Sequence, residues 1–319
     1  MRHLISLKEN SAAELLEILS IAEKLKKLGN AGKKIDLLKN QTLIMLFQKS
    51  STRTRLSFEA AMTELGGHAI FLDAKTTQFS LTDFKDEIKA VMRYGSVLMF
   101  RAMKVADVEL AAKQNQIPVI DACSEKYHPC QALGDLLTMS EVVGGLKKLK
   151  KIAWLGTENN VSNTLKLACA KLGVQVSLIA PEINQASVDQ ELNELAEKTG
   201  LITHTTDLET GLTDVQFIHT DTWMDMEFFD QGKVRAEFQT EYERRKKVLL
   251  PFQVNKKLLD TYCPQAKIMH CMPCHVGYEI SRDAIDHPNS VIFDQAENRL
   301  HIQKAIIIWL LGLENLVCV

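Results

Sequence analysis

The chain has 319 residues, of which 46% are hydrophobic and 24% are charged. This length suits two globular domains of ordinary size, and the composition is typical of a folded protein. The formal net charge of −2 provides no overall field that would attract nucleic acid or an anionic membrane. We therefore expect neither class of partner, and any site for an anion must be local.

The N-terminal segment lacks the cationic start and apolar core of a signal peptide, and no stretch is apolar over the length of a membrane span. It is predicted to form an amphipathic helix instead. Seven cysteines are an odd number, and without an export signal we expect reduced thiols in a cytoplasmic protein. The apolar side of the predicted helix carries Leu15, Leu16, Ile18, Leu19, Ala22 and Leu25.

Helix-like stretches alternate with short apolar strands in the first half of the chain, which predicts a parallel sheet covered by helices. A polar stretch at Asp73–Ser80 is predicted to be a mobile loop. A helix at Cys130–Val143 leads to Gly144-Gly145, which we interpret as a domain boundary. The predicted strands are Thr42–Phe47, His68–Leu72, Val97–Phe100 and Pro118–Asp121.

The second half repeats the alternation and predicts a second doubly wound unit, which suggests a dinucleotide site. However, the turn Gly156–Asn160 lacks the glycine spacing that lets a pyrophosphate approach the backbone, so we do not expect NAD. The last helix, Ala296–Gly312, is apolar over much of its surface and is predicted to pack between the domains. The other predicted elements are the strands Lys151–Gly156, Val174–Ile179, Val215–His219 and Lys267–His270 and the helix Ser162–Leu172.

The most informative motif is Ser51-Thr52-Arg53-Thr54-Arg55, directly after the first predicted strand. Arginine forks match the geometry of a phosphate, and hydroxyls with the N–H groups of a helix start complete an anion site. The alternative interpretation is a basic surface turn, such as a kinase site. The helix that follows is predicted from the spacing of Leu56, Phe58, Ala60, Met62 and Leu65.

Four further segments follow in order: His128-Pro129-Cys130-Gln131, Asp221-Thr222-Trp223, His270-Cys271-Met272-Pro273 and Gln295–Leu300. Together with the first motif they resemble the aspartate/ornithine carbamoyltransferase superfamily over nearly the whole chain, most closely its ornithine branch. The resemblance implies two doubly wound parallel-sheet α/β domains joined by long helices. Residues 1–143 would bind carbamoyl phosphate and residues 144–319 the acceptor, with 296–312 packing back on the first domain.

The resemblance also implies a reaction. The side-chain amine of L-ornithine attacks the carbonyl of carbamoyl phosphate, an oxyanion forms, and phosphate departs to leave L-citrulline, as in arginine metabolism. No metal or organic cofactor is required. The implied catalytic residues are Arg101, His128, Asp221 and Cys271, with Cys271 orienting and relaying and not acting as a covalent nucleophile. The implied carbamoyl phosphate site comprises Ser51, Thr52, Arg53, Thr54, Gln78, Arg101, His128, Gln131, Cys271, Met272 and Arg299.

For the acceptor, the resemblance implies Asn160, Asp221, Asp225 and Met226. Asp225 departs from the ornithine pattern, which has serine there, and an added carboxylate repels an α-carboxylate. Putrescine or an acylated ornithine therefore stays open as acceptor, as does a paralogue that binds carbamoyl phosphate without turnover. Aspartate is not expected, because that branch has lysine at the loop position of Gln78 and proline in place of Cys271.

The segment Cys271–His275 also fits a haem-attachment pattern, and its cysteines and histidines suggest zinc or a redox pair. Haem attachment needs an exported chain, a structural zinc site usually has two such pairs, and a redox pair normally opens a helix. We therefore expect none of the three. The family resemblance further implies a homotrimer or a multiple of trimers, with active sites between subunits and the Gln78 loop donated by a neighbour.

Overall fold

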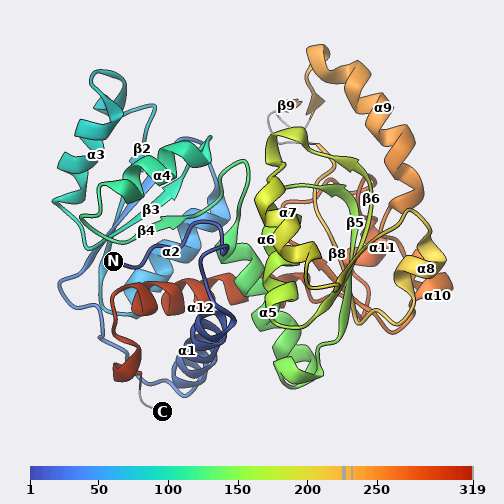
Figure 1. Cartoon of the computed structure of the whole chain (residues 1–319), viewed down its shortest axis with the longest axis horizontal. Coiled ribbons are helices and arrows are strands. Elements are labelled where there is room, and N and C mark those ends of the chain that lie inside the picture. The colour runs from blue at the N-terminus through green and yellow to red at the C-terminus, as the bar shows by residue number, and fades with distance from the viewer. Residues whose placement is uncertain (225–227, 231–232, 318–319) are drawn as a thin grey trace.

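The computed structural model describes residues 1–224, 228–230 and 233–317. Two lobes each contain a parallel β-sheet, and helices α5 (Pro129–Val143) and α12 (Ile292–Leu310) lie where the lobes meet (Figure 1). The predicted fold class, two doubly wound α/β units joined by long helices, is confirmed.

The first sheet has the strand order β2-β1-β3-β4, all parallel. Alternate side chains of its central strand enter different cores: Leu43 and Met45 pack into the core shared with α12, whereas Ile44 and Leu46 pack into a core on the opposite face. Both faces are therefore buried, which explains the continuous apolar run of this strand. The elements are β1 (Thr42–Phe47), β2 (His68–Asp73), β3 (Val97–Arg101), β4 (Val119–Asp121), α2 (Thr52–Glu64), α3 (Phe84–Met92) and α4 (Val105–Lys113).

The second sheet has the order β11-β8-β5-β6-β7, again all parallel. Its central strand divides in the same way, with Ile152 and Trp154 facing one core and Ala153 and Leu155 the other. The strands are β5 (Lys151–Glu158), β6 (Gln175–Ile183), β7 (Ile202–His204), β8 (Phe217–Thr220) and β11 (Lys267–His270); β9 (Phe229–Asp230) and β10 (Lys233–Val234) form a separate antiparallel pair. The helices are α6 (Asn160–Lys171), α7 (Gln190–Glu197), α8 (Leu208–Leu212), α9 (Gln239–Leu249), α10 (Lys256–Tyr262) and α11 (Arg282–Ile285).

Helix α12 packs against α1 (Ala12–Asn30), α2 and α5, as well as against β11. The last helix thus runs back to the first lobe and contacts both units (Figure 1). Short 3₁₀ turns occur at Gln78–Ser80, Leu146–Lys148, Gln185–Ser187, Ala236–Phe238, Leu250–Phe252 and Glu314–Leu316.

The sequence predictions were wrong in several local details. Leu16, which was expected on the apolar side of its helix, is exposed, because it lies on the solvent side of α1 while neighbouring residues form the buried face. Helix α12 begins at Ile292, before the predicted Ala296, and α6 begins at Asn160, before the predicted Ser162. The predicted loop at Asp73–Ser80 includes the end of β2 and a 3₁₀ turn.

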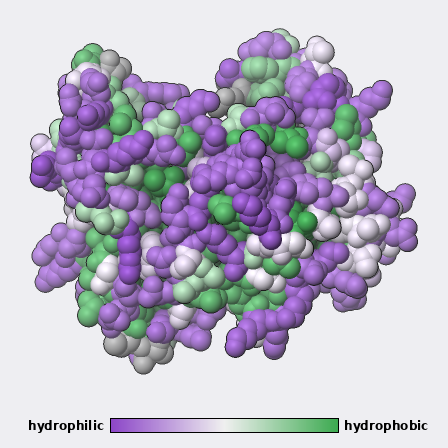
Figure 2. All heavy atoms as spheres, in the orientation of Figure 1, coloured by the Kyte–Doolittle hydropathy of each residue, from purple (hydrophilic) through white to green (hydrophobic). Residues whose placement is uncertain are grey.

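The face drawn in Figure 2 is largely hydrophilic, with scattered apolar side chains and a notch between the two lobes. Within the described residues, no helix is long and apolar enough to cross a membrane.

Candidate active site

The N-terminus of α2 lies beside the carboxyl end of β1 and is shaped by its first residues. Ser51 is the N-cap: its hydroxyl oxygen accepts a hydrogen bond from Thr54 N–H at 3.3 Å and donates to Thr54 Oγ1 at 3.1 Å. The N–H groups of Thr52 and Arg53 belong to the first turn of the helix, where no intrahelical acceptor exists. The helix start therefore offers backbone donors and a favourable dipole to an anion.

Three arginines lie at this helix start: Arg53 of the helix itself, and Arg101 and Arg299 from distant parts of the chain. Arg299 Nη2 from α12 donates to Thr54 Oγ1 at 2.9 Å, and Arg101 Nη1 from the end of β3 approaches the same oxygen at 3.5 Å. Arg53 lies close to Arg101, whose positive charge acts on it, and close to Cys271. Burial, reinforced by the neighbouring Arg101, lowers the pKa of both Arg53 and Arg299.

Four buried polar atoms at this place lack a hydrogen-bond partner among the described residues. They are Arg101 Nε, Arg299 Nε, His128 Nδ1 and Gln131 Oε1. Leaving such groups unpaired in a protein interior costs about 1–3 kcal/mol each, so their accumulation at one point indicates a site made for a ligand. The set offers donors to phosphate oxygens and to a carbonyl, and an acceptor for an amide N–H.

His128 is held at the start of α5 by its backbone. Its N–H donates to Thr164 Oγ1 of α6 at 2.9 Å, which joins the two units at this point. Burial, followed by the charges of Arg299, Arg101 and Lys49, lowers the pKa of His128 well below its ordinary value. The imidazole is therefore neutral at neutral pH, and it can donate to a carbonyl oxygen without releasing a proton to it.

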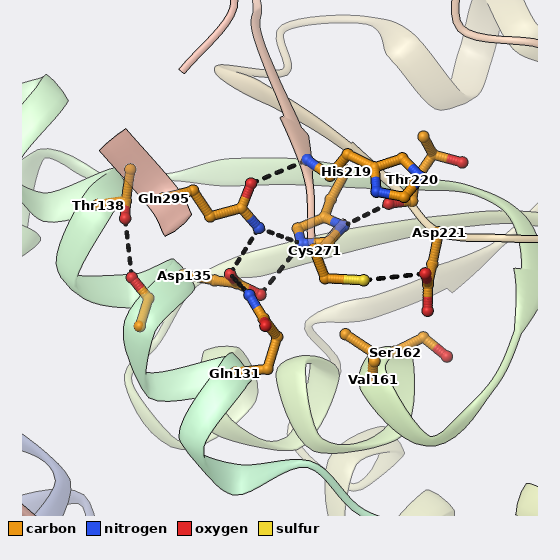
Figure 3. A network of polar contacts seen from close by, with 12 residues as sticks. Gln131, Asp135, Thr138, Val161, Ser162, His219, Thr220, Asp221, Cys271 and Gln295 are labelled. Atoms are coloured by element: carbon orange, nitrogen blue, oxygen red, sulfur yellow. Dashed lines mark hydrogen bonds and ion pairs between the residues drawn. The ribbon is translucent and has the colours of Figure 1, made fainter. Parts of the chain in front are cut away.

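Asp221 and Cys271 lie opposite each other at the carboxyl ends of β8 and β11, two adjacent strands (Figure 3). The Cys271 thiol donates to Asp221 Oδ1 at 2.9 Å, and Asn159 Nδ2 donates to Asp221 Oδ2 at 2.7 Å. Burial, followed by the charge of Asp221, raises the pKa of Cys271 well above its ordinary value. The thiol is therefore protonated and does not act as a thiolate nucleophile.

A buried polar network that sequence reasoning missed joins these parts (Figure 3). Asp135 accepts hydrogen bonds from Gln131 Nε2 at 2.8 Å and Gln295 Nε2 at 2.7 Å, and pairs with His219 Nε2 at 3.0 Å. Gln295 Oε1 in turn accepts from His270 N–H at 2.8 Å. The network fixes α5, β8, β11 and α12 relative to one another, and a signal for it was present in Gln295, which opens the last of the motifs.

One group of possible metal ligands occurs within the described residues: Asp221, His270 and Cys271 lie within 4.8 Å of one another. However, His270 Nδ1 accepts from Met272 N–H at 2.8 Å, and His270 Nε2 pairs with Glu279 Oε1 at 3.2 Å. Both ring nitrogens are thus committed to the protein. The group fits the role of a hydrogen-bonding cluster better than that of a metal site.

The remaining predicted site residues are Thr52, Gln78, Asn160, Met272, Asp225 and Met226. Gln78 and Thr52 are exposed, and Gln78 lies in the 3₁₀ turn after β2. Asn160 Nδ2 donates to Ser124 O at 2.7 Å, while the neighbouring Asn159 contacts Asp221. Met272, next to Cys271, has a positive φ of 54°, a strained conformation typical of functional sites. Asp225 and Met226 lie outside the described residues.

Comparison with known proteins shows which family the chain resembles along its whole length. Residues 2–141 match the carbamoyl-P binding domain of the aspartate/ornithine carbamoyltransferases, and residues 148–310 match their Asp/Orn binding domain. The ornithine carbamoyltransferase of Pyrococcus abyssi is 40% identical over 98% of this chain and 96% of its own, and that of Archaeoglobus fulgidus is 39% identical over 99% of both.

Solved structures give the same result. The ornithine carbamoyltransferase from Pyrococcus furiosus has a TM-score of 0.88 at 39% identity, covering 98% of this chain and 97% of its own. The anabolic enzyme from Campylobacter jejuni has a TM-score of 0.85 at 34% identity, covering 97% and 99%. The chain belongs to the aspartate/ornithine carbamoyltransferase family.

Proposed function

We propose that the protein transfers the carbamoyl group of carbamoyl phosphate to the side-chain amine of L-ornithine, producing L-citrulline and phosphate. The observation that carries this proposal is a set of unpaired buried atoms on Arg101, Arg299, His128 and Gln131. Two of these residues, Arg101 and Arg299, contact Thr54 at the first lobe's helix start, and the hydrogen-bonded pair Asp221 and Cys271 lies in the second lobe. In this assignment residues 1–143 bind carbamoyl phosphate and residues 144–319 bind the acceptor.

The phosphate occupies the helix start and the arginine forks, where Ser51, Thr52 and Thr54 add hydroxyl and N–H donors. Arg101 and neutral His128 donate to the carbonyl oxygen, and their hydrogen bonds strengthen as negative charge develops there. Gln131 Oε1 accepts from the carbamoyl NH₂. The amine nitrogen forms a bond to the carbonyl carbon, and the bond from that carbon to the phosphate oxygen breaks.

Asp221 holds the acceptor ammonium and receives support from the Cys271 thiol. The amine must lose a proton before it attacks, and its ordinary pKa lies well above neutrality. The turnover number should therefore rise from acid to mildly alkaline pH.

Asp221→Asn should reduce the turnover number sharply with little change in the affinity for carbamoyl phosphate. Full activity in that variant would show that Asp221 has no part in the mechanism.

The first experiment measures ureido product by colorimetry for ornithine, putrescine, N-acetylornithine and aspartate. We expect ornithine to have the highest kcat/KM. If product forms from another amine and not from ornithine, that amine is the acceptor. Binding of carbamoyl phosphate without product from any amine would indicate a non-catalytic relative.

Asp225→Ser tests the departure from the ornithine pattern. We expect the ratio of kcat/KM for ornithine to kcat/KM for putrescine to change by about tenfold or more.

Arg53→Ala tests the anion site, with Arg55→Ala as a matched control from the same motif. Arg55 is exposed, pairs with Glu59 at 2.9 Å and lies over the Phe71 ring, so it is committed elsewhere. Loss of a charge-assisted contact of about 1.5–3 kcal/mol should weaken carbamoyl phosphate binding by about 10- to 100-fold in Arg53→Ala only. Equal affinities in calorimetry would exclude Arg53 from the site.

We propose further that the protein is a cytoplasmic homotrimer in which Gln78 serves a neighbouring subunit. Its exposed position in the turn after β2, beside the strongly exposed Leu81, supports this. Subunits carrying Gln78→Ala and subunits carrying Asp221→Asn should each be nearly inactive, yet mixed oligomers should regain activity at sites that combine the intact residues. If the mixed oligomers recover no activity, or if light scattering shows a monomer, the active site is not shared between subunits.

A further inference from the structure

A buried carboxyl group that the proposed mechanism does not use lies at the carboxyl end of β4. Asp121 has no exposed surface. Its Oδ1 accepts a hydrogen bond from Cys123 N–H at 2.9 Å, whereas its Oδ2 is buried without a partner among the described residues. A buried oxygen of this kind is expected to carry a proton, since an isolated buried carboxylate is far more costly than a neutral acid.

Asp121 stabilises a turn that leads directly to His128. Cys123 has a φ of 155°, a conformation that residues with a Cβ rarely adopt, and its N–H is the group bound by Asp121. Ser124 then closes the turn: its N–H donates to Tyr127 O at 3.1 Å and its Oγ accepts from Tyr127 N–H at 3.2 Å. The residue that follows this closed turn is His128.

The same turn is bound from the second unit by α6. Asn160 Nδ2 donates to Ser124 O at 2.7 Å, Thr164 Oγ1 donates to Asn160 O at 3.0 Å, and His128 N–H donates to Thr164 Oγ1 at 2.9 Å. The hydrogen bonds thus form a circuit from Asp121 through the turn and α6 back to His128. The residue before Asn160 is Asn159, the partner of Asp221, so this circuit reaches both halves of the site.

We propose that Asp121 is a positioning residue. It holds the turn of residues 121–128, and this turn places the His128 imidazole where it can donate to the carbamoyl carbonyl. This inference rests on the proposed function, because it assigns His128 to the carbamoyl group. Asp121 itself touches no reacting atom. It acts through the Cys123 backbone and Ser124, and α6 completes the restraint.

The electrostatic surroundings agree with a neutral carboxyl. Burial raises the pKa of Asp121 to about 7, although the nearby Ser124 hydroxyl and the hydrogen bond from Cys123 N–H favour the charged form. Lys49, from the segment after β1, also favours ionisation, and Glu125 in the turn opposes it; the nearby Cys130 thiol has its own pKa raised to about 12. The turn therefore closes on an uncharged acid below neutral pH.

The test separates phosphate binding from recognition of the carbamoyl group. Calorimetry compares phosphonoacetamide, a stable isostere of carbamoyl phosphate, with methylphosphonate, which keeps the phosphonate and lacks the amide. Wild-type protein should prefer phosphonoacetamide, and His128→Ala should lose that preference. Asp121→Ala should lose it to a similar extent, by about tenfold or more, with methylphosphonate affinity unchanged.

Two further variants make the outcome decisive. Asp121→Asn keeps the acceptor for Cys123 N–H and should retain the preference, while Thr164→Val should lose it. Thr157→Val is the matched control, since Thr157 is a buried threonine whose hydroxyl makes no hydrogen bond within the described chain. Retention of the preference in folded Asp121→Ala would overturn the proposal. Absence of the preference in wild-type protein would instead overturn the carbamoyl assignment of the site.

Discussion

At the residue scale, Cys271 illustrates how surroundings decide chemistry. The residue is partly buried beside Asp221, and desolvation together with the charge of Asp221 raises the pKa of its thiol, which serves as a hydrogen-bond donor. Cys271→Ser keeps an O–H donor to Asp221 and should lose less turnover than Cys271→Ala, which leaves Asp221 short of one hydrogen bond worth about 1.5–3 kcal/mol. Alkylation at pH 8, followed by mass spectrometry, should be slower at Cys271 in the folded than in the unfolded chain; equal rates would indicate a thiolate.

Asp121 gives a second residue-scale prediction, for stability against pH. In the folded chain its pKa is about 7, compared with the ordinary 3.8. Between these values the folded state retains a proton that the unfolded chain releases, so stability falls as pH rises from about 4 to about 7 and is level above. The loss is at most about 4 kcal/mol. The Tm of Asp121→Asn minus the Tm of wild type should therefore increase from pH 4.5 to pH 8. A Tm difference that does not change with pH would contradict the raised pKa of Asp121.

At the element scale, the junction of α5, β8, β11 and α12 depends on Gln295, which bonds both Asp135 and His270 N–H. Gln295→Leu leaves the buried His270 N–H without its acceptor, which costs about 1–3 kcal/mol, and removes one of the two glutamine hydrogen bonds to Asp135 Oδ1. Urea unfolding should show this loss. The matched control is Gln190→Leu, because Gln190 is exposed and its side chain hydrogen-bonds Glu194; this variant should change the free energy of unfolding by less than about 0.5 kcal/mol. Equal stabilities of the two variants would mean that the network does not hold the junction.

At the scale of the whole molecule, the N-terminal segment joins the lobes. Lys171 Nζ of α6 donates to the carbonyls of Leu7 at 2.8 Å, Lys8 at 2.8 Å and Asn10 at 2.5 Å, and Lys8 Nζ pairs with Asp189 at 3.2 Å. Lys171→Met should release this segment, because three carbonyls lose a charged donor. Amide hydrogen exchange of residues 4–10 should accelerate by about tenfold or more.

The matched control for this prediction is Lys150→Met, since Lys150 Nζ bonds a single carbonyl, that of Lys147, on the exposed surface. Exchange of residues 4–10 should be unaffected in that variant. Unchanged exchange in Lys171→Met would show that apolar packing alone, including buried Leu4 and Leu7, holds the segment in place.

The sequence by itself determined the strands and the local chemistry. The β1 and β11 boundaries agree with the prediction. For β1 the reason is its unbroken apolar run Leu43–Phe47, which is typical of a strand buried on both faces. The Ser51–Arg55 motif likewise predicted an anion site, since capping and donor geometry are local. Helix faces were less certain: Leu16 and Leu56 fit the apolar spacing, yet they are exposed, because the position of a helix on its neighbours decides which face is buried.

Only the tertiary structure decided how distant residues meet. Arg299 reaches Thr54 across 245 positions of sequence, and Asp135, His219 and Gln295 form one buried network from three elements. Asn159, and not Asn160, contacts Asp221, while Asn160 restrains the turn before His128. Sequence spacing carries no information on such contacts, because they depend on how two sheets and α12 pack together and on which buried polar groups then find partners.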